Sequence, residues 1–232
     1  MARQIANLST ADSQTQKTAL QILATDGIFT FSTAEREKWQ DEFLAFANSL
    51  GDVCVQDDCD PSGIKTLPAE VACKGSILHT DRGSMERPPE IVLIFCETQS
   101  DQGGESIFLD GKALVDTLPA QVTSDLAAEN SVCFGFPKYI RMTRILDETK
   151  DQRRFIRYRN DRWGFFAPSI RAHVDTIEDA FADLTETVRL PAGTGIAFRN
   201  DRYLHGALPS KAGDRIIHRL LVANTSLQYG FE

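Results

Sequence analysis

Two side chains of the segment GSILHTDRGS (75–84) have types and spacing that suit a metal ion. His79 and Asp81 are two residues apart at the end of a short apolar run. On a β-strand such residues point to the same face, about 6.6 Å apart along the chain. An imidazole and a carboxylate can therefore converge on one divalent ion if the strand end bends. A solvated polar strand end has the same pattern, so a metal site requires a third ligand from elsewhere.

The best candidate for the third ligand is His205. It follows a Gly-rich turn and an apolar segment within AGTGIAFRNDRYLHGALPS (192–210), and this order predicts a histidine at the mouth of a sheet. His173 comes just before a predicted helix, where an exposed or capping role is favoured.

The remaining histidine, His218, lies next to Arg219 in the last predicted strand. Neighbouring side chains of a strand point to opposite faces, so only one of the two can reach a pocket. If Arg219 points inward, Arg215 shares its face and His218 does not.

The elements that must position these residues begin with helices. Apolar spacing predicts a helix at 14–25 and another at 33–50, separated by a short strand at 27–32. Ser32 or Thr33 is expected to cap the second helix.

The chain then becomes rich in β-strands. Segments 75–80, 90–98 and 104–110 read as strands separated by Gly, Pro and Asp turns. The run IVLIFC (91–96) is apolar on both faces, which predicts a central strand covered on both sides. Further expected elements are helices at 110–119, 120–128 and 175–188, strands at 153–159, 190–200 and 215–227, and a mobile excursion at 137–152.

These elements predict one domain over residues 1–232, with an α+β fold and a mainly antiparallel β core. Its expected parts are a helical N-terminal part at 1–51 and a core at 70–225, with an insert at about 130–175.

Charge and composition narrow the class of partner. The net charge of −8 disfavours nonspecific binding to nucleic acid or to an anionic membrane. The chain has five cysteines, an odd number without C-x-x-C spacing, and no apolar leader. We therefore expect free thiols and a cytoplasmic protein. No apolar run approaches the ~20 residues of a membrane span, so we expect no membrane partner. No sequence feature specifies an oligomeric state.

Four motif pieces in order give a resemblance to a known family. The chain resembles the iron(II)/2-oxoglutarate-dependent dioxygenases, in particular the taurine dioxygenase and clavaminate synthase-like group. That group has His-x-Asp/Glu, a Ser/Thr about 25 residues on, a distant His and an Arg beyond it. Here Ser106 of GGES (103–106) is 25 residues after Asp81, and Arg219 is 14 residues after His205. The similarity spans most of residues 70–225.

The resemblance implies a jelly-roll core, also called a double-stranded β-helix. It also implies that His79, Asp81 and His205 are the catalytic metal ligands, holding Fe(2+) as a facial triad with three open positions for 2-oxoglutarate and O2. Arg219 is the expected partner of the far carboxylate of 2-oxoglutarate, with the Ser106 hydroxyl beside it. Arg215 is expected to touch the cosubstrate or the substrate, although a surface charge fits it equally well.

The reaction implied is oxidative decarboxylation of 2-oxoglutarate to succinate and CO2, coupled to hydroxylation or desaturation. Asp81 favours hydroxylation over halogenation, because the halogenating relatives have a small residue at this position. The chain departs from the group in Arg199, where an Asp is common, and in a short gap between Ser106 and His205.

Two other functions fit parts of the pattern. A non-catalytic jelly-roll module that binds a small acid would use the pocket alone, and a metal-dependent hydrolase would use the same ligands to activate water. The expected substrate is small and polar, an amino acid or another carboxylate. Its expected contacts are Lys74 and Ser76, beside the His-x-Asp motif, with Arg141 or Arg144 facing a carboxylate.

Overall fold

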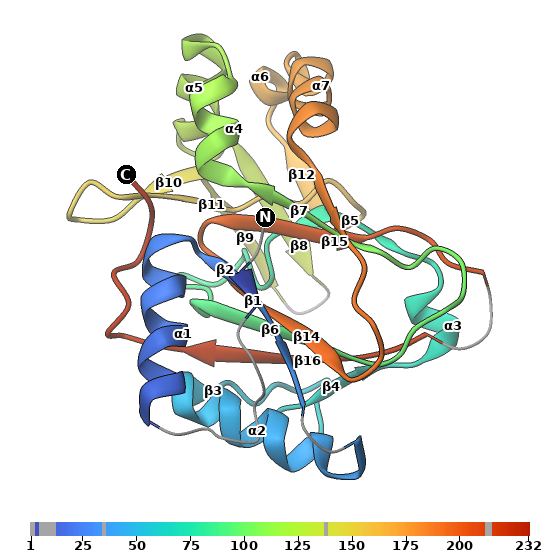
Figure 1. Ribbon diagram of the computed structural model, residues 1–232. Coiled ribbons are helices and arrows are strands. Elements are labelled where there is room, and N and C mark those ends of the chain that lie inside the picture. Colours follow the sequence, from blue (N-terminus) through green and yellow to red (C-terminus); the bar gives the residue numbers. More distant parts are fainter. Residues whose placement is uncertain (1–2, 5–12, 34–35, 137–138, 212–214) are drawn as a thin grey trace.

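Two mainly antiparallel sheets pack against each other in the computed structural model, which describes residues 3–4, 13–33, 36–136, 139–211 and 215–232 (Figure 1). The larger sheet has the order β1-β2-β14-β6-β16-β3, with β4 also paired to β16. Its strands are β1 (Arg3–Gln4), β2 (Ile28–Ser32), β3 (Asp52–Val53), β4 (Lys65–Leu67), β6 (Ile91–Thr98), β14 (Thr194–Arg199) and β16 (Ile216–Ala223). The smaller sheet has the order β13-β7-β15-β5. Its strands are β5 (Ser76–His79), β7 (Ser106–Asp110), β13 (Glu186–Val188) and β15 (Tyr203–Ala207).

Strand β6 is covered on both faces, as its sequence predicts. Ile91, Leu93 and Phe95 pack into a cluster with the N-terminal helices. Val92 and Ile94 alternate with them and pack into the layer between the two sheets. This central strand pairs with β14 on one side and β16 on the other, so β6 anchors the larger sheet.

The N-terminal helices cover the outer face of the larger sheet (Figure 1). Helix α1 spans Ser13–Thr25 and α2 spans Trp39–Leu50, preceded by a 3-10 turn at Arg36–Lys38. The predicted cap is wrong, because Ser32 belongs to β2, where it pairs with Thr194. Helix α2 begins after Lys38, whose side chain makes no capping hydrogen bond.

Four helices pack on the outer side of the smaller sheet, where they share a second apolar cluster with β7 and β15 (Figure 1). They are α4 (Gly111–Thr117), α5 (Ala120–Ala127), α6 (Pro168–Arg171) and α7 (Val174–Leu184), and a short α3 spans Ala69–Ala72. The helix expected at 175–188 ends early, because residues 186–188 form β13 and pair with β7.

The region expected as a mobile excursion at 137–152 forms strands at 139–143 and 146–148, with short non-strand stretches at 144–145 and 149–152; residues 137–138 lie outside the described residues. The strands belong to a three-stranded sheet β12-β8-β9 and a hairpin β10-β11. Their bounds are β8 (Val132–Phe136), β9 (Tyr139–Thr143), β10 (Leu146–Glu148), β11 (Arg154–Ile156) and β12 (Gly164–Phe166).

The expected α+β fold with a mainly antiparallel core is confirmed. In the described part of the chain, no helix is both long and apolar enough to cross a membrane.

Candidate metal centre and two adjoining cavities

His79 and His205 face each other on neighbouring strands. They are direct partners in the antiparallel pairing of β5 with β15, and such partners project side by side on one face. Their ring centroids are 4.4 Å apart. The register brings together two imidazoles that are 126 residues apart in sequence.

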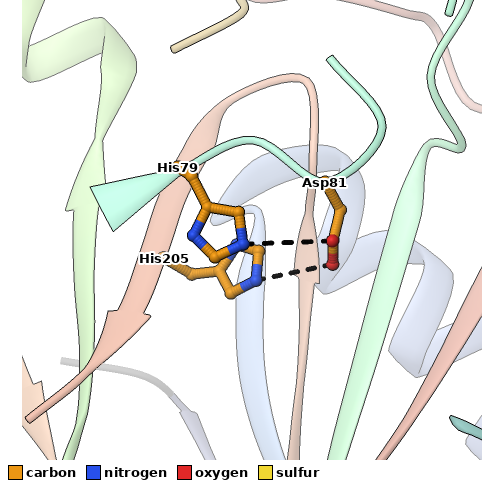
Figure 2. A group of neighbouring side chains, drawn as sticks. All are labelled: His79, Asp81 and His205. Carbon is orange, nitrogen blue, oxygen red and sulfur yellow. Dashed lines mark ion pairs between the residues drawn. The ribbon is translucent and has the colours of Figure 1, made fainter. Parts of the chain in front are cut away.

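Asp81 completes the cluster just after β5 ends. Its Oδ1 lies 4.0 Å from Nε2 of His79, and its Oδ2 lies 3.5 Å from Nε2 of His205 (Figure 2). One possible ligand atom from each residue lies within 4.8 Å of the others. All three side chains are nearly buried, so the cluster combines convergence with shielding from water.

Asn200 fixes the backbone of Asp81 on both sides. The Asp81 N–H donates to Asn200 Oδ1 at 3.0 Å, and Asn200 Nδ2 donates to the Asp81 carbonyl at 2.9 Å. The same amide nitrogen donates to the Pro89 carbonyl at 3.0 Å. Asn200 is fully buried, so this clamp sets the direction of the carboxylate.

The protonation states suit metal binding. Burial lowers the pKa of His79 to about 3, so its imidazole is neutral at neutral pH. Its Nδ1 lies 2.8 Å from the Ile77 carbonyl, which requires Nδ1 to carry the proton and leaves the Nε2 lone pair facing Asp81. The Arg219 guanidinium and the His205 imidazole hold the pKa of Asp81 well below its usual value, against the opposing effect of burial.

These side chains fit a resident divalent ion. Oδ2 of Asp81 is buried without a hydrogen-bond partner, and burying such an acceptor is costly unless something binds it. Two imidazoles and one carboxylate are the donor set of non-haem iron(II) oxygenases. His79, Asp81 and His205 would hold that ion.

Arg219, the expected cosubstrate anchor, lies against the triad and contacts its carboxylate. Its Nη1 donates to Oδ1 of Asp81, so in this structure it acts as the counter-ion of the metal-ligating carboxylate. His218 points away from it, as alternation predicts. His218 lies 3.0 Å from Thr66 and 2.7 Å from Glu97, and it packs on Trp39 with a centroid distance of 4.1 Å.

A cavity of about 220 Å³ adjoins one side of the triad. Its lining includes Ser106, Arg215, Ile94 and Ile217, and we call it the Ser106 cavity. Arg215 is only 4 % exposed. Within the described residues it has no hydrogen-bond or ion-pair partner, and its Nε is an orphaned buried donor.

Glycine makes room for this arginine. Gly104 has φ +75°, and a Cβ there would lie 2.7 Å from Cδ of Arg215. The Ser106 cavity therefore contains a buried positive charge beside a hydroxyl, in a space that the backbone leaves open for the arginine stem.

A second cavity, of about 320 Å³, adjoins the other side. We call it the Asp58 cavity, and its lining includes Asp58, Lys65, Arg82, Phe134 and Trp163. His79, Arg159 and Arg219 line both cavities. The triad therefore stands between two spaces of different composition.

The expected substrate residues are not all brought to the triad. Ser76 lines the Ser106 cavity, whereas Lys74 is exposed and lines neither cavity. Arg144 pairs with Glu129 at 3.1 Å and lies 4.0 Å from Asp147, away from the site. Arg141 lines neither cavity, although it pairs across the sheet with Phe134 of the Asp58 cavity.

Several residues of the site escaped the sequence reasoning. Lys65, Arg82 and Asp58 are charges in short strands and loops, which resemble solvated surface groups in sequence. Arg159 is the last residue of the strand predicted at 153–159, and its backbone bridges to that of His79. Asn200 lies beside Arg199 and five residues before His205, and its role depends on a contact with a distant part of the chain.

Comparison with known proteins supports the same chemistry. The family model described as taurine catabolism dioxygenase TauD, TfdA family matches residues 4–221. No curated protein matches significantly.

Solved structures show the same fold at low sequence identity. PvcB from Pseudomonas aeruginosa matches with a TM-score of 0.73 and 13% identity, over 92% of this chain and 82% of that one. An asparagine oxygenase with Fe(II), 2S,3S-3-hydroxyasparagine and succinate has a TM-score of 0.74 and 12% identity, over 90% and 78%. The oxygenase OrfP with Fe, succinate and (3S)-hydroxy-L-Arg has a TM-score of 0.72 and 13% identity, over 93% and 82%.

Proposed function

The chain belongs to the TauD, TfdA family of dioxygenases, and from this premise we propose how its residues serve an iron(II)- and 2-oxoglutarate-dependent oxygenase. The enzyme class follows from the family match together with the His79, Asp81 and His205 cluster. We propose that these three residues hold the iron. The observation that carries the proposal is the buried Asp81 carboxylate, which faces the imidazoles of His79 and His205 and whose Oδ2 has no hydrogen-bond partner.

We propose the Ser106 cavity as the site of 2-oxoglutarate, with Arg215 as the anchor of its far carboxylate. A planar guanidinium matches a carboxylate in a bidentate pair. Arg215 is buried and unpaired in the described structure, whereas Arg219 is already bound to Asp81. We therefore propose Arg215 in place of Arg219 as the anchor, with the Ser106 hydroxyl in the same cavity.

Bound iron(II), with 2-oxoglutarate and O2, would supply the oxidising chemistry that releases succinate and CO2. The protein orients the groups around it. Asn200 holds the Asp81 backbone, and the Ile77 carbonyl holds the tautomer of His79. Such outer contacts set ligand direction and basicity. The Phe198 ring packs 4.8 Å from the His205 ring and helps to keep this face dry.

We propose the Asp58 cavity as the substrate site, and a small polar substrate such as an amino acid or another carboxylate as its occupant. The asparagine oxygenase and OrfP complexes contain hydroxylated amino acids, and the cationic lining of this cavity suits a carboxylate. Hydroxylation or desaturation is the expected outcome, because Asp81 provides the carboxylate ligand.

The finer description of the fold is also a proposal. We propose that the two facing sheets form a jelly roll within one domain, with the N-terminal and inserted helices outside it. The five cysteines are all free, which supports the expected cytoplasmic compartment.

The test is succinate release from 2-oxoglutarate by the purified protein. We expect it to require iron(II), O2 and 2-oxoglutarate together, and to stop when zinc replaces iron. Absence of succinate release together with zinc-supported hydrolysis of an ester or amide would favour the hydrolase alternative. Binding of 2-oxoglutarate without any turnover would favour the non-catalytic module.

A further inference from the structure

The Asp58 cavity carries an excess of positive charge. Four of its lining side chains are cationic, namely Lys65, Arg82, Arg159 and Arg219, and two are carboxylates, Asp58 and Asp81. The whole chain has a net charge of −8, so this local excess opposes the overall balance. A cavity with this lining must be occupied by anions, by water or by both.

The carboxylates of the cavity are shared among several cations. Asp58 Oδ2 lies 2.5 Å from Lys65 Nζ, and Asp58 Oδ1 lies 2.9 Å from Arg82 Nη2. Arg82 also donates to Gln56. An ammonium has three donor hydrogens and a guanidinium five, so both side chains keep donors that Asp58 and Gln56 do not use.

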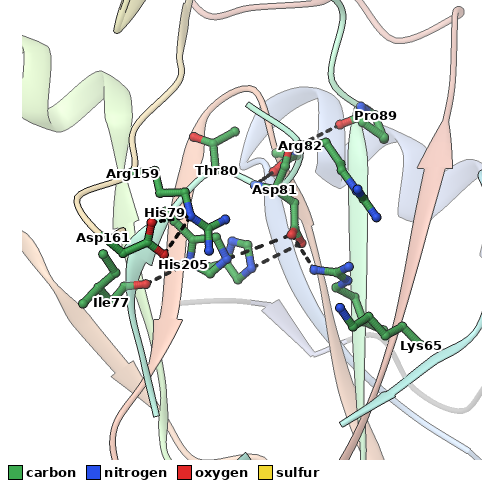
Figure 3. A network of polar contacts seen from close by, with 12 residues as sticks. Lys65, Ile77, His79, Thr80, Asp81, Arg82, Pro89, Arg159, Asp161 and His205 are labelled. Atoms are coloured by element: carbon green, nitrogen blue, oxygen red, sulfur yellow. Dashed lines mark hydrogen bonds and ion pairs between the residues drawn. The ribbon is translucent and has the colours of Figure 1, made fainter. Parts of the chain in front are cut away.

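Arg159 is also only partly used. Both of its ion-pair contacts to Asp161 come from Nε, at 2.9 and 2.8 Å. Its two terminal nitrogens therefore have no partner in the described part of the chain, and Arg159 stands beside His79 at the border of both cavities (Figure 3).

Loading of the metal centre would leave a further positive charge unbalanced. In this structure Arg219 shares the Asp81 carboxylate. Iron(II), Asp81, the doubly charged cosubstrate and Arg215 neutralise one another when all are bound. The charge of Asp81 is then counted against iron(II), so the positive charge of Arg219 is no longer balanced even where its contact with Oδ1 of Asp81 persists. Arg159 keeps Asp161, and Asp58 balances only one of Lys65 and Arg82. Two positive charges remain without compensation.

We propose that the substrate of this enzyme carries two anionic groups. This deepens the proposed function and rests on it. One group binds Arg219 and the free nitrogens of Arg159, beside the iron ligands. The other binds Lys65 and Arg82 at the Asp58 end. The rings of Phe134 and Trp163, which line the same cavity, contact the carbon chain between them.

The charge arrangement distinguishes an acid from its amide. An amide has nearly the same shape but leaves one cationic group without an anion, and charge-assisted hydrogen bonds are the stronger ones. Lys65 and Arg82 are 26% and 33% exposed, so solvent screens part of the difference. We expect the acid to bind about tenfold more tightly than its amide.

The experiment is isothermal titration calorimetry of the full chain, loaded with iron(II) and 2-oxoglutarate under nitrogen. The probes are L-aspartate, L-glutamate and L-2-aminoadipate, each compared with its own side-chain amide. We expect at least one acid to bind about tenfold more tightly than its amide. If none of the three acids binds more tightly than its amide, the proposal is wrong.

Variants separate the charge effect from a folding defect. Lys65→Met is expected to remove the preference for the acid, and the matched Lys112→Met, on helix α4, is expected to keep it. Asp58→Asn removes the carboxylate that competes for Lys65 and Arg82, so it is expected to tighten binding of the acid. Weaker binding of the acid to Asp58→Asn would contradict the assigned roles.

The same titrations distinguish this inference from the proposed function. If iron(II) and 2-oxoglutarate bind but no acid is preferred, the two-anion substrate is wrong and the oxygenase assignment stands. If iron(II) and 2-oxoglutarate do not bind, the proposed function fails, and this inference fails with it.

Discussion

Asn200 binds both backbone polar groups of Asp81, accepting from its N–H at 3.0 Å and donating to its carbonyl at 2.9 Å. The contact joins the turn after β14 to the segment after β5, 119 residues apart in sequence. Asp81 is the only carboxylate of the triad, so its direction depends on this buried amide.

Asn200→Asp keeps the acceptor for the Asp81 N–H but loses the donor to two carbonyls. Outer-shell changes of this kind typically lower metal affinity by about 10–100-fold, and we expect a loss in that range. Iron(II) titration under nitrogen measures it. Asn48→Asp, an exposed position on α2, is the control. Unchanged iron affinity in Asn200→Asp would show that the clamp is not needed.

Two variants test which arginine binds 2-oxoglutarate: Arg215→Gln, just before β16, and Arg219→Gln, within it. Loss of a charged hydrogen bond costs about 1.5–3 kcal/mol, so Arg215→Gln is expected to raise the KM for 2-oxoglutarate roughly 10- to 100-fold. Arg219→Gln is expected to change this KM less. Steady-state kinetics with varied 2-oxoglutarate measures both KM values. A larger increase in Arg219→Gln than in Arg215→Gln would show that Arg219 is the anchor.

Gly104→Ala tests the space around Arg215. The new Cβ would lie 2.7 Å from Cδ of Arg215, and φ at Gly104 is +75°, so we expect both lower stability and weaker 2-oxoglutarate binding. Gly193→Ala is a matched control, since its φ is +82° and nothing lies within 4 Å of its Cβ position. Equal loss of 2-oxoglutarate affinity in both variants would mean that Arg215 is not displaced.

Stability is expected to fall as the pH is lowered through about 6.5, the ordinary pKa of histidine. Burial lowers the pKa of folded His218 below that value and the pKa of His79 to about 3. Below pH 6.5 the unfolded chain therefore binds more protons than the folded chain. Urea unfolding of the metal-free protein at pH 8 and pH 5.5 measures the difference. His218→Gln should reduce it, and an unchanged difference would contradict the assignment to His218.

The sequence predicts the parts of this site that depend on local pattern. Period-two alternation and the apolar run of residues 91–96 identify β6 as a central strand, and the spacing of His79 and Asp81 places them on one face. The facing of His79 and His205 depends on the register of two distant strands, which local pattern does not encode. Only the family resemblance predicts that His79 and His205 bind the same metal ion.

Other features depend on more than local pattern. Spacing and the family resemblance favour Arg219 as the anchor, whereas the proposal of Arg215 rests on the partners of the two arginines, which both line the cavity. The excursion expected at 137–152 forms strands because β9 pairs with β8 and β10 pairs with β11. Lys65, Arg82 and Asp58 become a site only when the fold brings β4 and two loops together.

The most direct test of the central claim is an anaerobic iron(II) titration of the wild-type chain and of His79→Ala, Asp81→Ala and His205→Ala. We predict one iron per wild-type chain, loss of this binding in all three variants, and retention in His173→Ala, whose imidazole lies 2.8 Å from Asp125 and outside the triad. Tight binding of one iron by any of the three triad variants would contradict the assignment of His79, Asp81 and His205 as the metal ligands.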